Sequence, residues 1–115
     1  MTHAEPVWPA VIKHQGDDEL LYLADSEDWQ QTAETLLFGA DNDVLIDSLG
    51  RVYNCLVDTA APVLQVTDRD ILLADFSQIL KQHMVALNQC CVSKLHIDSI
   101  AQGLQMVKDT LEDRG

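Results

Sequence analysis

The spacing of apolar residues changes midway along this chain, and that change restricts its fold more than any other feature. Up to about residue 66 the apolar residues form short runs between turn signals, whereas from Phe76 onward they recur every three or four positions. The first pattern is typical of strands and the second of amphipathic helices. Strand-rich sequence before helix-rich sequence predicts an α+β domain. We expect a mostly antiparallel sheet built from the N-terminal hairpins, with one short and two longer helices packed on one face.

The first predicted hairpin joins the apolar runs Val7–Ile12 and Leu20–Ala24. Gly16 lies in the turn between them, where glycine adopts backbone angles that other residues resist. Pro9 has no amide hydrogen, so we expect the first strand to lie at an edge of the sheet or to carry a bulge at this residue. Because the run is apolar on both faces, such an edge would favour self-association.

The second predicted hairpin turns at Asp47-Ser48-Leu49-Gly50, between Val44–Ile46 and Arg51–Val57. Aspartate at the first position and glycine at the fourth are typical of a type I turn. Beyond Pro62, the run Val63–Val66 predicts a further extended segment.

A short helix is predicted after the first hairpin. Asp25 or Ser26 is expected to cap it, because Glu27 and Asp28 then fall in the first turn and favour the positive end of the helix dipole. Gly39 is the predicted end.

Two longer helices are predicted in the second half. The first carries the apolar spacing Phe76, Ile79, Leu80, Met84 and Leu87, with Asp75 as its cap, and the second carries a stripe from Ile97 to Leu111. Gly103 lies inside the second helix, where glycine is unfavourable by about 1 kcal/mol relative to alanine, which indicates close packing. Between the helices, Cys90–Leu95 is an alternative last strand that would make the sheet mixed.

The residues of the two hairpins resemble a family of small bacterial proteins known only as a domain of unknown function. The first match is Trp8-Pro9-Ala10-Val11-Ile12-Lys13 followed by Gly16-Asp17-Asp18-Glu19-Leu20 and Tyr22, and the second is Leu45-Ile46-Asp47-Ser48 with Gly50 and Val52. The similarity extends to Ser99-Ile100-Ala101-Gln102. It implies a stand-alone α+β domain, and it carries over no catalytic or binding residue.

The length and composition predict a single domain covering residues 1–115. A chain of this size buries roughly 65% of its unfolded surface, which is sufficient for a core without disulfides or metals. The sequence contains no cationic leader and no apolar run long enough to cross a membrane. Three cysteines, two of them adjacent, indicate reduced thiols and a cytoplasmic location.

The charge is strongly negative and unevenly distributed. The chain has 19 acidic and 7 basic residues, a formal net charge of −12, which disfavours nucleic acids and anionic membranes as partners. Residues 1–60 hold 12 acids and 2 bases, a net charge of −10, and the remainder carries only −2. A segregated acidic surface attracts basic proteins over a Debye length of about 8 Å at physiological salt. The candidate interaction surface comprises Asp17, Asp18, Glu19, Asp25, Glu27 and Asp28.

Other chemistry has weaker support in the sequence. The turn Asp17-Asp18-Glu19 contains oxygen ligands for a divalent cation, but consecutive side chains point in different directions. Zinc-ligand types occur at His83, Cys90, Cys91 and His96, without the usual spacing of two to four residues between paired ligands. We therefore assign no catalytic residue, metal or cofactor, and we expect His83 to be a packed histidine bonded to backbone.

The sequence thus favours a non-enzymatic protein-interaction module that binds a basic partner or self-associates. The alternative is a small-ligand or metal-binding domain, which would require His83, Cys90, Cys91 and His96 or the acidic turn to converge. A third hypothesis is an acidic mimic of nucleic acid, which requires carboxylates spaced like phosphates along one face.

Overall fold

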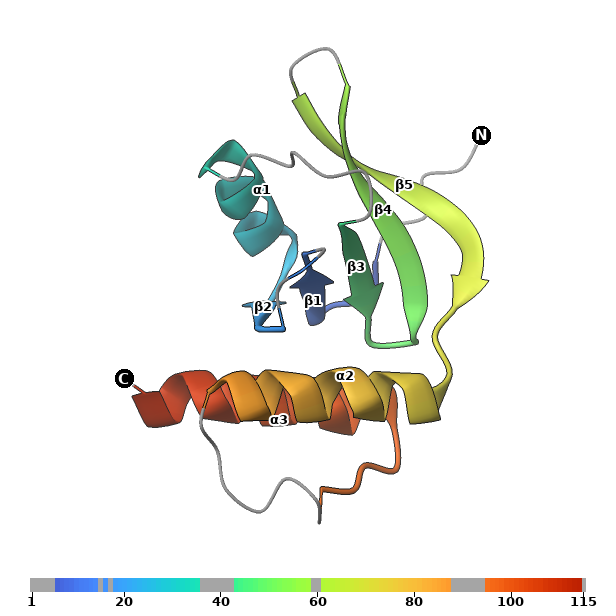
Figure 1. The fold of residues 1–115 in the computed structure, drawn as a ribbon. Helices are drawn as coiled ribbons and strands as arrows, with labels where there is room; N and C mark the ends of the chain where they lie inside the picture. Colours follow the sequence, from blue (N-terminus) through green and yellow to red (C-terminus); the bar gives the residue numbers. More distant parts are fainter. Residues whose placement is uncertain are drawn as a thin grey trace.

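One antiparallel sheet organises the described part of this chain. The computed structural model describes residues 6–14, 16, 18–35, 43–58, 61–87 and 95–114. The elements in chain order are β1 (Ala10–Lys13), β2 (Leu20–Leu23), α1 (Ser26–Thr35), β3 (Val44–Asp47), β4 (Arg51–Asp58), β5 (Ala61–Asp70), α2 (Leu73–Ala86) and α3 (Ile100–Arg114). The strands lie in the order β2-β1-β3-β4-β5, so β2 and β5 form the two edges (Figure 1). The predicted α+β class is confirmed.

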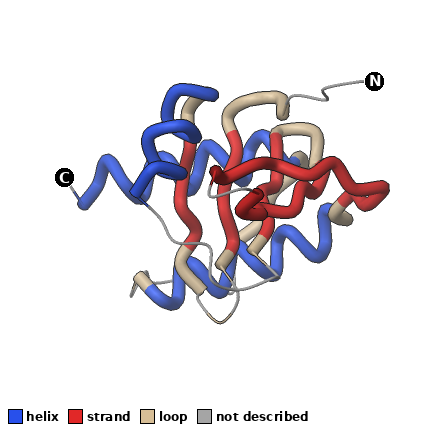
Figure 2. The backbone as a smooth tube through the Cα atoms, turned by 90° about the horizontal axis from the view of Figure 1, so that it is seen from above, coloured by secondary structure: helices blue, strands red, loops and turns tan. Residues whose placement is uncertain are grey.

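The two faces of the sheet pack against different helices. Val11 of β1 belongs to a core that includes residues of α2 and α3, whereas Ala10 and Ile12 belong to a second cluster on the opposite face. This alternation follows from the two-residue period of a strand. The two longer helices therefore share one face, as predicted, and the strands cross over them in the view from above (Figure 2). The short helix α1 packs its Trp29 against the second cluster, so the expectation that all three helices share one face is wrong for α1.

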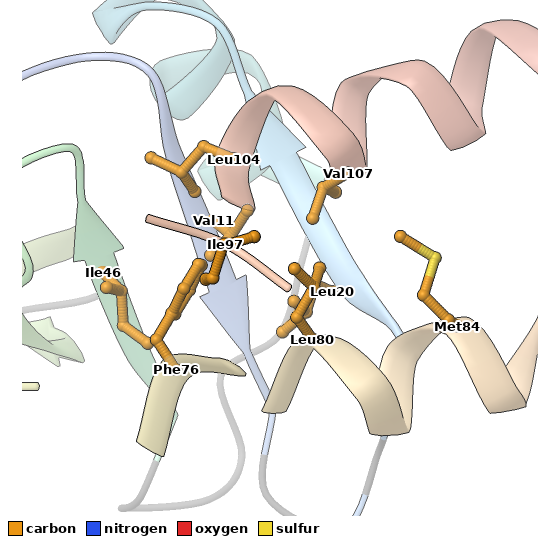
Figure 3. Packing of buried hydrophobic residues seen from close by; sticks show 9 residues of the cluster. All are labelled: Val11, Leu20, Ile46, Phe76, Leu80, Met84, Ile97, Leu104 and Val107. Atoms are coloured by element: carbon orange, nitrogen blue, oxygen red, sulfur yellow. The ribbon is translucent and has the colours of Figure 1, made fainter. Parts of the chain in front are cut away.

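The main core lies between the sheet and the two longer helices. Figure 3 shows side chains from β1, β2, β3, α2, α3 and the segment before α3 converging there: Val11, Leu20, Ile46, Phe76, Leu80, Met84, Ile97, Leu104 and Val107. Gly103 allows the helices to approach each other, because a Cβ atom at this position would lie 2.5 Å from Cε2 of Phe76. The close packing predicted at Gly103 is confirmed.

Both predicted hairpins are present, but the first strand is not an edge. β1 pairs with β2 on one side and β3 on the other, so the expected edge position of the first strand is wrong, and β1 offers no open edge for self-association. The physical reason is that β1 begins at Ala10, one residue after Pro9, so the missing amide hydrogen interrupts no pairing. The peptide bond preceding Pro9 is cis.

The turns contain the expected glycines. Gly16 and Gly50 have φ angles of 83° and 81°, in the left-handed region that favours glycine. In the second hairpin the Gly50 N–H donates to the Asp47 carbonyl at 2.9 Å, which closes the predicted turn. The extended segment after Pro62 is confirmed as part of β5.

The helix caps differ from the predictions at one position. The Asp25 carboxylate accepts the Asp28 N–H at 2.9 Å and caps α1 as predicted. Asp75 does not cap α2, because the helix begins at Leu73 and places Asp75 in its first turn, where a carboxylate still favours the helix dipole. The helix end predicted at Gly39 and residues 90–94 of the proposed last strand lie outside the described residues. Leu95 itself is not in a strand.

Candidate functional site

The predicted acidic surface is divided by β2. Asp18 and Glu19 are exposed immediately before this strand, whereas Asp25 and Glu27 are exposed after it. Four strand residues span about 13 Å, so the two groups lie at opposite ends of β2. Asp17 lies outside the described residues. The six candidate residues therefore do not form one continuous described cluster.

Two of the predicted surface residues have a structural role at the start of α1. Asp25 accepts the Asp28 N–H, and the Asp28 carboxylate in turn accepts the Ala24 N–H at 2.9 Å. Such reciprocal bonds satisfy backbone donors that a helix start leaves without partners. Asp28 is partly buried, and one of its carboxylate oxygens is already bonded to backbone.

Asp47, an acidic residue of the first half, is fully buried and serves the fold. Its carboxylate accepts the N–H groups of Leu49 at 2.9 Å and Arg51 at 3.0 Å, which fixes the turn between β3 and β4. It also accepts the Val7 N–H and the Tyr53 hydroxyl, both at 3.1 Å. Burial, together with the nearby Asp47 charge, raises the pKa of Tyr53. The charge of Asp47 is therefore unavailable to a partner.

Asp43 is also buried, and it lies 3.0 Å from Nδ1 of His14. The buried thiol of Cys55, a residue of β4, is close to Asp43. Its pKa is raised to about 12, mainly by burial and to a smaller extent by the Asp43 charge. A nucleophilic cysteine requires the thiolate, and here the environment favours the protonated form. Asp43, His14 and Cys55 therefore do not have the electrostatics of a cysteine nucleophile.

His83 is a buried histidine that connects three elements, as the prediction of a packed histidine requires. Its Nδ1 accepts the Leu20 N–H of β2 at 2.8 Å, and its Nε2 lies 3.4 Å from Oγ1 of Thr110 on α3. The Thr110 hydroxyl donates to the Val107 carbonyl at 2.6 Å. Because Nδ1 accepts a backbone N–H, the histidine proton belongs on Nε2, where it donates to Thr110.

His96, another predicted ligand residue, has a different partner from those of His83. His96 lies 2.8 Å from Asp98, and both side chains are about four-fifths exposed. Cys90 and Cys91 lie outside the described residues. Within the described ranges, no three histidine, cysteine, aspartate or glutamate side chains are grouped so that they could hold a metal ion.

The edge of the sheet at β2 is closed by side chains. The Leu20 N–H points away from β1 and is bonded to His83 of α2. Four residues further on, the Ala24 N–H is bonded to Asp28 of α1. Occupied donors at these two positions disfavour pairing with another chain. Side chains of α1 and α2, which lie on opposite faces of the sheet, therefore bond to backbone at this edge.

The edge at β5 differs from the edge at β2. The pairing of β4 with its two neighbours shows which backbone groups of β5 face outward. The Cys55 N–H donates to the Asp43 carbonyl at 3.0 Å, so Cys55 directs its backbone groups toward β3. These groups alternate in direction along an antiparallel strand, so Asn54 directs its own toward β5, where it pairs with Gln65. The neighbours of Gln65, which are Leu64 and Val66, therefore point their N–H and C=O groups away from β4.

The outward-facing part of β5 is limited at both ends. Pro62 follows the same alternation, so its missing N–H lies on the outer side, which is where proline is tolerated in a strand. Beyond Val66 the register with β4 shifts, and the Thr67 hydroxyl replaces a regular ladder contact by donating to the Val52 carbonyl. Among the described residues β5 pairs only with β4, which leaves Leu64–Val66 as an open window. We call residues Leu64, Gln65 and Val66 the β5 window.

Sequence reasoning did not identify the β5 window. The available signal was Pro62 at the start of the last apolar run before the helical half, because proline is confined to edge strands and strand starts. The edge-strand interpretation is given to Pro9 instead.

No helix in the described ranges is long and apolar enough to cross a membrane. Among curated protein sequences, none matches this chain. An NMR structure of a protein from Shewanella Amazonensis is similar to it, with a TM-score of 0.70 and 25% sequence identity over 95% of this chain and 93% of that one. The model of the DUF4144 family, described as a protein structure with unknown function, matches residues 8–107. Because this match covers most of the sequence, the chain belongs to the DUF4144 family.

Proposed function

We propose that this chain is a protein-interaction module without enzymatic activity, which accepts an extended segment of a partner protein beside β5. The proposal rests on a difference between the two sheet edges in the partners of their outward N–H groups. Side chains from α1 and α2 occupy outward N–H groups at the β2 edge, whereas those of Leu64 and Val66 face away from the sheet. Strand addition at such an edge provides main-chain hydrogen bonds to the partner.

The side chains of the window suit this role. Val66 is 50% exposed, and its side chain lies on the same face as that of the half-buried Leu64. Alternate side chains of an added strand would contact this apolar pair, which provides selectivity in addition to the backbone bonds. Uncharged side chains also avoid the desolvation cost of burying a charge.

A proline at Val66 tests the proposal, because it removes an outward N–H and leaves the ladder with β4 intact. The probe is a seven-residue peptide of alternating valine and threonine, titrated into labelled protein and followed by NMR amide exchange. We expect the peptide to slow exchange at Leu64 and Val66 in the unmodified chain. Binding should be lost in Val66→Pro and retained in the matched control Val66→Thr, which keeps the N–H. Equal binding by both variants would show that the β5 window is not the site.

A further inference from the structure

Resting on the proposed function, we infer that the partner beside β5 is a second copy of this chain, whose β5 pairs antiparallel with the first about a two-fold axis at Gln65. The pair joins two five-stranded sheets into one continuous sheet. Three features support this occupant: the pattern of outward backbone groups, the fixed conformation of β5 and the positions of the described charges.

The β5 window is complementary to itself. Leu64 and Val66 each direct an N–H and a C=O group outward, and Gln65 between them is paired with β4. In an antiparallel pair centred on Gln65, Leu64 of each copy lies opposite Val66 of the other, so both bonds are exchanged at each facing position. All outward groups of the window then have partners. A pair centred on Leu64 would instead face Val66 with Pro62, whose missing N–H would leave the Val66 carbonyl unpaired.

The second copy supplies a strand that is already extended. β4 holds β5 in register from Ala61 to Val66, so the outward groups are in position before the copies meet. A flexible segment must be ordered as it binds, and that loss of conformational entropy opposes association. The facing side chains also match, because Leu64 and the half-exposed Val66 of one copy lie on the same face as those of the other.

The described acidic residues lie far from this joint, although the chain carries a net charge of −12. The exposed acids Asp18, Glu19, Asp25 and Glu27 flank β2, at the edge opposite β5 (Figure 1). With strands about 4.8 Å apart, nine spacings separate the β2 strands of the two copies, a distance of about 43 Å. This distance is several times the Debye length of about 8 Å, so salt screens the repulsion between the two acidic edges.

The described charges beside the window are also kept apart. They are Arg51, Arg69 and Asp70, and Arg51 is opposite Asp70 in the ladder between β4 and β5. At about 3.3 Å per residue, a two-fold axis at Gln65 places Arg69 about 26 Å and Asp70 about 33 Å from its counterpart in the second copy. The uncharged centre of β5 therefore meets its own copy without bringing like charges together.

Sedimentation equilibrium over a range of concentrations tests this inference. We expect the unmodified chain to dimerise reversibly, with slower amide exchange at Leu64 and Val66 as the concentration rises. Val66→Pro removes an N–H donor from each copy and should weaken the association at least about tenfold. The matched control Val66→Thr keeps the N–H and should weaken it clearly less.

A disulfide tests the register. Two residues that face each other at a non-hydrogen-bonded position have Cα atoms about 4.5 Å apart, within the range of a disulfide. Gln65→Cys should therefore form a disulfide between the two substituted positions under mild oxidation, identified by peptide mapping. Val66→Cys is the control, because its two copies are offset along the strands by about 8 Å, beyond that range.

The outcomes separate this inference from the proposed function. A chain that stays monomeric at millimolar concentration, while the valine–threonine peptide still protects Leu64 and Val66, would overturn the second copy and leave strand addition standing. A dimer that Val66→Pro does not weaken, or that forms no disulfide in Gln65→Cys, would also overturn the inference. If the chain stays monomeric and the peptide protects neither amide, the proposed function itself fails.

Discussion

The two edges of this sheet are built in opposite ways. β2 has four residues and lies against the helices. The N–H of its first residue, Leu20, is bonded to His83, and the N–H of Ala24, the residue after the strand, is bonded to Asp28. β5 has ten residues, pairs only with β4 among the described residues, and directs the backbone groups of Leu64 and Val66 outward. The difference shows that side chains of two helices bond outward donors at one edge. At the other edge, a proline and a register shift shorten the open part of the strand without covering it.

The closed edge depends on the helical layer, so disturbing that layer should have the largest effect. Gly103→Val places side-chain atoms where Phe76 already lies within 2.5 Å of a Cβ position. We expect a loss of about 3 kcal/mol in the free energy of unfolding, measured by urea denaturation. The matched control is Ala101→Val on the exposed side of the same helix, which should lose less than about 1 kcal/mol. Equal losses would refute the close packing of α2 and α3.

His83 provides a hydrogen bond between α2 and β2. His83→Phe keeps a ring in the core but leaves the Leu20 N–H without its acceptor, so stability should fall by about 1 to 3 kcal/mol. Amide exchange at Leu20 should accelerate, while exchange at Leu64 and Val66 stays unchanged. The exposed His96→Phe serves as control and should change stability by less than about 0.5 kcal/mol. A neutral His83→Phe variant would mean that the β2 edge needs no such closure.

The thiol of Cys55 lies opposite Leu64 in the ladder and is buried. It therefore tests whether the core beside β5 stays closed to solvent while the outward backbone groups of β5 are exposed. Its pKa is raised to about 12 in the folded chain, above the unfolded value of about 8.5. The thiol therefore contributes stability below about pH 8.5, and this contribution is lost as the pH rises toward 12. We expect a loss of about 1 kcal/mol by roughly pH 9.5 that is absent in Cys55→Ala. Alkylation of Cys55 as fast in the folded chain as in urea, measured by peptide mapping, would contradict its burial.

The open edge should tolerate substitutions that a paired strand would not. Val66→Pro should change stability by less than about 0.5 kcal/mol, because the lost N–H bonds no other strand in the described part of the chain. Gln65→Pro, the neighbouring control, removes a bond to β4 and should cost clearly more in urea denaturation. Similar losses from the two variants would place Val66 in a paired ladder.

The class and the hairpins were predictable because local chemistry decides them. The Asp47-Ser48-Leu49-Gly50 turn and the cap at Asp25 use bonds between near neighbours in sequence, and both are confirmed. The order of the strands was not predictable, because β3 reaches β1 across some thirty residues of chain. That long-range pairing placed β1 inside the sheet and made β5 the edge.

The β5 window and the burial of individual carboxylates were not predictable from the sequence. Sequence charge treats every aspartate alike, but Asp47 and Asp43 are buried and Asp28 is bonded to backbone. Only tertiary structure shows which carboxylates remain exposed. The open backbone groups of Leu64 and Val66 have no side-chain signature, since backbone direction follows from the register of β4 with its two neighbours.

Native-state amide exchange of the monomeric chain, measured without any partner, distinguishes the closed edge at β2 from the open edge at β5. We expect the Leu20 amide to exchange as slowly as the Gln65 amide, because the first is bonded to the His83 ring and the second is paired with Asn54 of β4. The amides of Leu64 and Val66, on either side of Gln65, should exchange much faster. Uniform protection from Leu64 to Val66, or rapid exchange at Leu20, would contradict the assignment of a closed edge at β2 and an open edge at β5.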